Sequence, residues 1–184
     1  SLNGLGDAEV SLRYGISTPG SALPIAISLT LGLPLGEDVA GEQGRLQTGD
    51  GEFNQVIMAH IGSGFKLGKK NAYWSAQLGI NNRTNGFSDE FRYGLEGGIA
   101  LINTKLWVIG RLNGVNSFFN GDVVPDVDNT SIFSNNTEFL SPGLELNYYV
   151  TEKLGFSVGA AGAISGKIIA ASPGFSAGVF LDLK

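Results

Sequence analysis

The feature that most constrains this chain is a long alternation of apolar residues with small or polar ones. Around position 25, for example, Ile25, Ile27 and Leu29 alternate with Ala26 and Ser28. Successive side chains of a β-strand point to opposite faces of the sheet, so this alternation predicts a strand with one apolar face.

The same alternation recurs along the whole sequence and predicts nine strands and no helix. The predicted strands cover residues 7–16, 24–35, 53–65, 72–82, 89–101, 105–115, 139–150, 154–163 and 173–183. Strands follow one another without intervening helices, which indicates an all-β, antiparallel, up-and-down sheet.

Strand length favours one class of such sheets. The predicted strands run ten to thirteen residues, whereas strands of soluble proteins cluster near five or six and a tilted membrane strand needs about nine to eleven. Their non-apolar face is mostly Gly, Ser, Ala and Asn rather than Lys and Glu. This composition suits a barrel lumen, so we expect a transmembrane β-barrel with its apolar face toward lipid.

Composition excludes several other classes. Charged residues make up 16% of the chain, against about 25% in soluble domains. No apolar run approaches the roughly eighteen residues of a membrane helix. The net charge of -5 argues against nucleic acid as a partner, and the absence of Cys excludes disulfides and thiolate metal sites.

The connections orient the predicted barrel. The first, third, fifth and seventh connections (17–23, 66–71, 102–104, 151–153) are mostly short, and the others (36–52, 83–88, 116–138, 164–172) are mostly longer. The connections 17–23 and 83–88 are similar in length, but the other six alternate strictly, as periplasmic turns alternate with extracellular loops. The first strand then starts on the outer side. Bacterial barrels usually have an even number of strands, so we expect a single domain over 1–184 that lacks one or three N-terminal strands, or is completed by another chain, with about 10–12 strands in all.

Aromatic residues fit two interfacial girdles, although strands are enriched in such residues for other reasons as well. The inner girdle would contain Tyr14, Phe65, Trp74, Tyr148 and Phe156, and the outer one Phe91, Tyr93 and Phe175.

Several short, Gly-rich segments carry a family resemblance. They are Gly4-Leu5-Gly6-Asp7, Leu12-Arg13-Tyr14, Leu31-Gly32-Leu33-Pro34-Leu35-Gly36 and Thr48-Gly49-Asp50-Gly51. From Gly4 to Val115 the chain resembles the outer-membrane barrels of the phenol meta-degradation (MetA-pathway) transporter family. The resemblance implies a channel for small, apolar or aromatic solutes, with one to three strands before the segment at Gly4.

Charged residues on the non-apolar face form the main candidate site. These predicted lumen residues are Glu9, Arg13, Arg92, Glu96, Arg111, Glu145 and Asp182, joined by Gln77, Asn113, Asn147 and Tyr149. They predict either a polar track that sets solute selectivity or a ladder of ion pairs that fills a narrow barrel, and a narrow bore slightly favours the ladder.

A catalytic site is not expected. His60 is the only His, and Ser28, Ser75 and Gln77 are its possible partners on the same face, without a recognisable catalytic motif. We therefore predict no enzyme activity, no cofactor and no metal.

The long connections add two expectations. Their acidic residues are predicted to be solvated rather than to bind Ca²⁺, because their spacing does not match a calcium loop. These residues are Glu37, Asp38, Glu42, Asp50, Glu52, Asp122, Asp126 and Asp128. Phe118 and Phe119 are predicted to fold inward as a plug or to dock a solute or protein partner.

Three hypotheses follow for the function. The first is a passive channel of the bacterial outer membrane, with selectivity set by Arg13, Arg92, Glu96, Arg111 and Glu145. The second is a non-conducting accessory barrel that holds partners in a larger envelope complex. The third, a soluble lipocalin-like binding barrel, is disfavoured by the long apolar faces and the low charge.

Overall fold

The computed structural model describes residues 4–38, 47–123, 133–170 and 172–183. It contains ten strands and, within those ranges, no helix that could cross a membrane. The strands are β1 (Ala8–Gly15), β2 (Ile25–Leu33), β3 (Asn54–Leu67), β4 (Lys70–Asn82), β5 (Glu90–Leu101), β6 (Leu106–Ser117), β7 (Glu138–Tyr149), β8 (Leu154–Ala161), β9 (Ser165–Lys167) and β10 (Gly174–Leu181).

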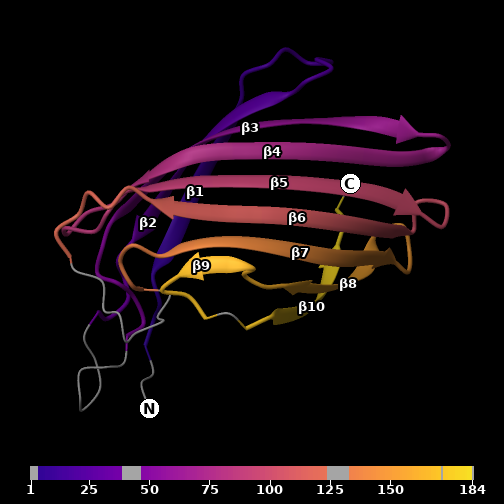
Figure 1. Ribbon diagram of the computed structural model, residues 1–184. Coiled ribbons are helices and arrows are strands. Elements are labelled where there is room, and N and C mark those ends of the chain that lie inside the picture. Colours follow the sequence, from indigo (N-terminus) through magenta and orange to yellow (C-terminus); the bar gives the residue numbers. More distant parts are fainter. Residues whose placement is uncertain (1–3, 39–46, 124–132, 171, 184) are drawn as a thin grey trace.

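All ten strands belong to one antiparallel sheet. Nine of them pair in the order β1-β2-β3-β4-β5-β6-β7-β8-β10, and the three-residue β9 pairs with β7 instead. The strands lie side by side in chain order (Figure 1). The prediction of an all-β, up-and-down antiparallel sheet is confirmed.

Each of the nine predicted strands corresponds to one strand of the nine-strand path. The count of nine was wrong, because β9 lies inside the predicted connection 164–172. The predicted lengths were also too uniform: observed lengths run from 8 residues in β1, β8 and β10 to 14 in β3. Among the nine strands of the path, the shortest are β1 and β10 at its two ends and β8, which lies next to β10.

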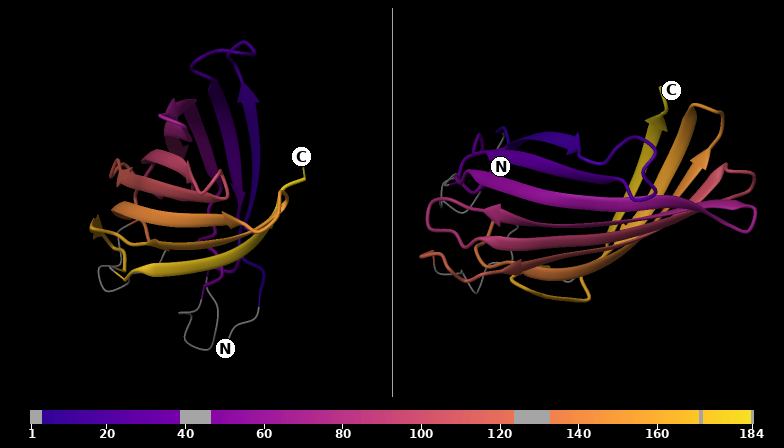
Figure 2. Two further views of the ribbon diagram at one scale, coloured as in Figure 1. Left: turned by 90° about the vertical axis from the view of Figure 1, so that its right-hand side faces the viewer. Right: turned by 90° about the horizontal axis from the view of Figure 1, so that it is seen from above.

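The mostly short and the mostly long connections lie at opposite ends of the sheet (Figure 2), and only the β1–β2 connection (16–24) and the β4–β5 connection (83–89) depart from this division by length. The tightest turn joins β3 to β4 through Gly68 and Lys69 alone. Gly68 has φ of 62°, a left-handed conformation that two-residue hairpin turns require and that glycine adopts without strain.

The register keeps the two faces separate across the whole sheet. Leu29 pairs with Leu12 on β1 and with Ile57 on β3, and Ile57 pairs with Ile80 on β4. The alternate residues pair in the same way, for example Ser75 with Glu96 and Glu96 with Arg111. One face is therefore apolar from β1 to β10, and the other carries the polar residues.

The apolar face is the exposed one. Ile57 on β3 is 58% exposed, Leu78 on β4 57% and Leu95 on β5 56%. Buried residues gather on the polar face instead, among them Ser28, Val56, Asn81, Glu90 and Ile109. A single sheet layer buries one face only by curving around it, and Figure 2 shows this strong curvature. We call the polar side the concave face and the apolar side the convex face.

The two edges of the sheet are unpaired within the described residues. β1 pairs only with β2, and β10 pairs only with β8. Nine antiparallel strands in succession leave β1 and β10 running in the same direction.

Candidate functional site on the concave face

Three of the predicted lumen residues meet at the middle of the concave face. Arg111 on β6 donates through Nε to Oε2 of Glu96 on β5, at 2.5 Å, and through Nη1 to Oε2 of Glu145 on β7, at 2.6 Å. We call Glu96, Arg111 and Glu145 the charge trio. Their side chains are 24–34% exposed, so the trio faces the concave side without being sealed from it.

The trio follows from the pairing of consecutive strands. Glu96 pairs directly with Arg111, while Glu145 pairs with Ile109, two positions along β6 on the same face. The Tyr73 hydroxyl donates to Glu96 Oε1 at 2.7 Å, and Asn147 Nδ2 donates to Glu145 Oε1 at 2.9 Å. One guanidinium thus holds two carboxylates, which leaves a surplus of one negative charge.

Arg92 is also on the concave face, but its partner is a residue that the sequence analysis did not select. Its Nη2 donates to Glu90 Oε2 at 2.8 Å, and its Nε donates to the same oxygen at 3.0 Å. Arg92 therefore belongs to the long-loop end of the sheet rather than to the trio.

The remaining charged residues of the predicted lumen set lie on or directly after the edge strands β1 and β10. Glu9 and Arg13 are exposed on β1 and form no ion pair within the described part of the chain. Asp182 is half-buried and follows the last residue of β10. The structure therefore brings together only part of the predicted set.

The long-loop end holds a buried ionic cluster that sequence reasoning missed. Arg83, directly after β4, forms ion pairs with Glu52 and Asp50 of the β2–β3 connection and with Glu90 of β5, the last through Nη1 at 2.9 Å. We call these four residues the loop-end cluster. The side chains of Arg83, Glu52 and Glu90 are only 5%, 0% and 6% exposed.

The predicted solvation of the acidic loop was therefore wrong for Glu52. Desolvation raises the pKa of Glu52 to about 7, against the opposing effect of Arg83. At nearby Asp89, burial alone would raise the pKa of the carboxyl. Hydrogen bonds from Asn120, the Arg83 amide and Asn82 outweigh burial and hold that pKa below its ordinary value. Glu42, Asp126 and Asp128 lie outside the described residues.

The lone histidine does contact a serine. Ser28 Oγ and His60 Nε2 lie 2.8 Å apart on the concave faces of β2 and β3. Ser28 is only 7% exposed, and both strands are paired on each side. The ladder pairs their backbone N–H groups on both sides, so the two strands offer no free backbone donor beside Ser28. Within the described residues no group of His, Asp and Glu is placed to hold a metal ion.

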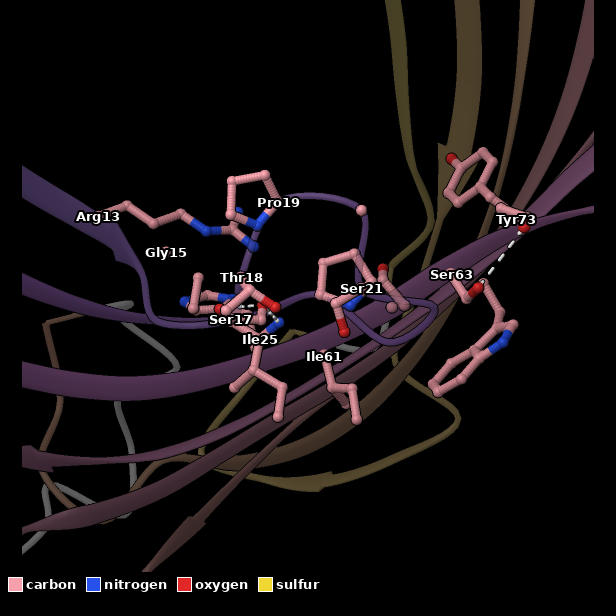
Figure 3. Close-up of a pocket in the computed structure, with 18 residues that line it drawn as sticks. Arg13, Gly15, Ser17, Thr18, Pro19, Ser21, Ile25, Ile61, Ser63 and Tyr73 are labelled. Carbon is pink, nitrogen blue, oxygen red and sulfur yellow. Dashed lines mark hydrogen bonds between the residues drawn. The ribbon is translucent and has the colours of Figure 1, made fainter.

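A hollow of about 530 Å³ lies at the β1–β2 turn (Figure 3). Arg13 extends toward Pro19 at its rim, and Ser63 and Tyr73 lie at the opposite end. A smaller hollow of about 270 Å³ lies at the short-turn end of β4, β6, β7 and β10, and is lined by Tyr73, Trp107, Ile109, Asn147, Tyr149 and Phe180.

Phe118 and Phe119, the predicted plug or docking residues, follow β6 directly and are 50% and 53% exposed. The Phe119 ring lies 4.9 Å from Lys167 Nζ of β9. Whether they block a passage or dock a partner stays a prediction.

Comparison with known proteins adds no relative. No protein-family model matches this sequence, and neither curated proteins nor solved structures gave a match.

Proposed function

We propose that this sheet forms the wall of an outer-membrane β-barrel channel, with the convex face toward lipid and the concave face lining the passage. The single observation that carries the proposal is the exposed apolar face, continuous across the register from β1 to β10. A water-soluble protein rarely exposes one contiguous apolar surface of this kind. Acyl chains are the solvent that such a surface matches.

Strand length supports the same proposal. β3, β4, β5, β6 and β7 have 12–14 residues, enough to cross the bilayer core when tilted. All eight aromatic residues predicted for the two girdles lie in strands at convex-face positions, where interfacial rings would meet the headgroup region.

A barrel requires that the edges of β1 and β10 find partners, because lipid leaves unpaired backbone groups unsatisfied. The two edge strands run in the same direction. Their direct pairing would be parallel, so an odd number of additional strands is needed for antiparallel closure.

The proposed solutes are small and apolar or aromatic, a class that rests on the resemblance to the phenol meta-degradation transporter family. The charge trio would restrict the passage near its middle and set the preference between cations and anions. The ion-pair ladder and the selectivity filter are then the same residues: their ion pairs fill the bore, and their surplus negative charge sets the ion preference.

The unpaired edges also favour a second candidate, a non-conducting barrel subunit of a larger envelope complex. In that case β1 or β10 would pair with a strand of another protein. The soluble lipocalin-like alternative requires the apolar face to point inward, opposite to the exposure seen here.

Conductance in planar lipid bilayers tests the proposal. The channel predicts stepwise conductance whose cation preference changes in Arg111→Ala. Conductance with an unchanged ion preference would reject the role of the trio, and the absence of conductance would favour the accessory subunit.

A further inference from the structure

The small hollow at the short-turn end of the concave face is built largely from aromatic rings. Tyr73 and Trp107 have ring centroids 5.7 Å apart at a tilt of 52°. Tyr149 and Phe180 meet edge to face with centroids 5.0 Å apart. Both pairs line the same volume of about 270 Å³. We call this hollow the aromatic pocket.

These rings are unusual for their place in the sheet. All four aromatic residues lie at concave-face positions. Two of them have an aromatic neighbour in the sequence on the convex face: Trp74 follows Tyr73, and Tyr148 precedes Tyr149. Lipid contact therefore does not explain Tyr73 and Tyr149. All four rings are half-buried around the pocket rather than fully packed into a core.

The charge beside the pocket is negative. Tyr73 donates to Glu96 of the charge trio, and Asn147 donates to Glu145 of the same trio. Arg111 compensates only one of the two carboxylates. The trio therefore places a net negative charge next to the aromatic walls.

The pocket wall also contains an unsatisfied acceptor. Asn147 donates through Nδ2, while its buried Oδ1 accepts no hydrogen bond from the described residues. A buried acceptor without a donor costs free energy. An N–H group that reached it with a small movement of the surrounding rings would remove this cost.

Aromatic faces, a net negative charge and a free acceptor together select one class of ligand. Aromatic faces attract cations, more strongly when water is excluded. We propose that the aromatic pocket binds a small primary ammonium with a ring or short apolar body. The ring or chain would pack among Tyr73, Trp107, Tyr149 and Phe180, and the ammonium would lie toward Asn147 and Glu145. A neutral ring would gain only the packing, and a carboxylate would be repelled by the trio.

This site goes beyond the proposed channel and does not depend on transport, because it needs only access from water to the concave face. It can therefore be tested by binding alone. The chain has two Trp residues, and Trp74 lies on the convex face. Trp74→Phe leaves Trp107, inside the pocket, as the only indole fluorophore.

The experiment titrates the Trp74→Phe protein in detergent micelles at neutral pH with benzylammonium, benzyl alcohol and benzoate. We expect a saturable change in Trp107 fluorescence with benzylammonium, with a Kd about tenfold lower than that for benzyl alcohol. Benzoate should bind more weakly than either. Equal affinity for the ammonium and the alcohol would overturn the proposal, because the pocket would then recognise only the ring.

Matched variants separate binding in the pocket from partition into the micelle. Tyr149→Leu should raise the Kd for benzylammonium about threefold or more, whereas Tyr148→Leu, the next residue on the opposite face, should leave it unchanged. If Tyr149→Leu fails to fold, Phe180→Leu tests the same wall. Glu145→Gln should reduce the preference for the ammonium over the alcohol. Equal effects of Tyr148→Leu and Tyr149→Leu would contradict the site.

The outcome is independent of the conductance test. Ammonium binding by a protein that conducts nothing would leave this inference standing and reject the channel. Conductance without ammonium preference would do the reverse.

Discussion

Arg111 lies between Glu96 and Glu145, and its Nη1 donates to Glu145 Oε2 at 2.6 Å across the β6–β7 pair. Glu145 is 49 positions from Glu96 in the sequence. Both carboxylates reach one guanidinium because β6, which carries Arg111, lies between β5 and β7. Removing this cation leaves two carboxylates facing the concave side without compensation.

Arg111→Ala is therefore expected to shift the ion preference of the reconstituted protein toward cations, by roughly two- to fivefold in permeability ratio. Glu145→Gln should shift it the other way. Reversal potentials under a salt gradient measure both. Shifts of the same sign in the two variants would contradict this arrangement of charges.

The loop-end cluster predicts a large effect on stability. Arg83→Met removes the only cation paired with Glu52 among the described residues, whereas Glu90 keeps its ion pair with Arg92. Leaving the buried Glu52 carboxylate without its cation costs about 3 kcal/mol of unfolding free energy. Denaturant unfolding in detergent micelles, followed by circular dichroism, measures the loss.

The control is an ion pair of similar chemistry with an exposed cation. Lys167 Nζ lies 2.6 Å from Glu138 Oε2, and the Lys167 side chain is 63% exposed. Lys167→Met is expected to change stability by less than about 1 kcal/mol. Equal losses of stability in the two variants would contradict the expectation that burial makes the loop-end cluster important for stability.

Glu52 gives the protein a pH-dependent stability. Its pKa is raised from 4.5 to about 7 in the folded state, so folding takes up a proton between these values. This contribution is complete below the unfolded pKa and is lost as pH rises through about 7.

The folded protein should therefore be less stable near pH 8.5 than near pH 5.5, by about 1–2 kcal/mol from this group. Asp89 does not interfere, because its lowered pKa places its titration below this range. Glu52→Gln should flatten the dependence, as measured by unfolding midpoints across this range. An unchanged slope in Glu52→Gln would assign the effect to another group.

The strands were predictable because the alternation is long and each strand pairs with the next. The register that joins Glu96 to Arg111 follows from the short connection 102–105, which fixes how β5 and β6 align. β9 was not predictable, because three residues carry no recognisable period.

The loop-end cluster could not be found from sequence because Arg83 is 31 positions from Glu52 and both lie in connections. Acidic connections are solvated by default, and only the folded arrangement buries Glu52. The aromatic pocket did leave a signal. Adjacent aromatic residues in one strand, such as Tyr148 and Tyr149, must point to opposite faces, so one of each pair had to be concave.

A charge on the convex face should distinguish lipid contact from water contact. Ile57→Lys places an ammonium at a position that is 58% exposed among apolar neighbours. In a bilayer this costs about 2–4 kcal/mol near the midplane, whereas a water-facing strand would tolerate it. Folding yield into lipid vesicles measures the effect, with Met58→Lys on the opposite face as the control. Equal yields would argue against lipid at Ile57.

The most direct test of the central claim is a spin-label scan of β3 in lipid vesicles. The chain has no Cys, so single Cys substitutions from Gln55 to Ile61 need no background changes. We predict that labels at 57, 59 and 61 collide with oxygen dissolved in lipid, and that labels at 56, 58 and 60 contact a water-soluble relaxant or are protected. The inverse pattern, or water contact at every position, would contradict a convex face that meets the membrane.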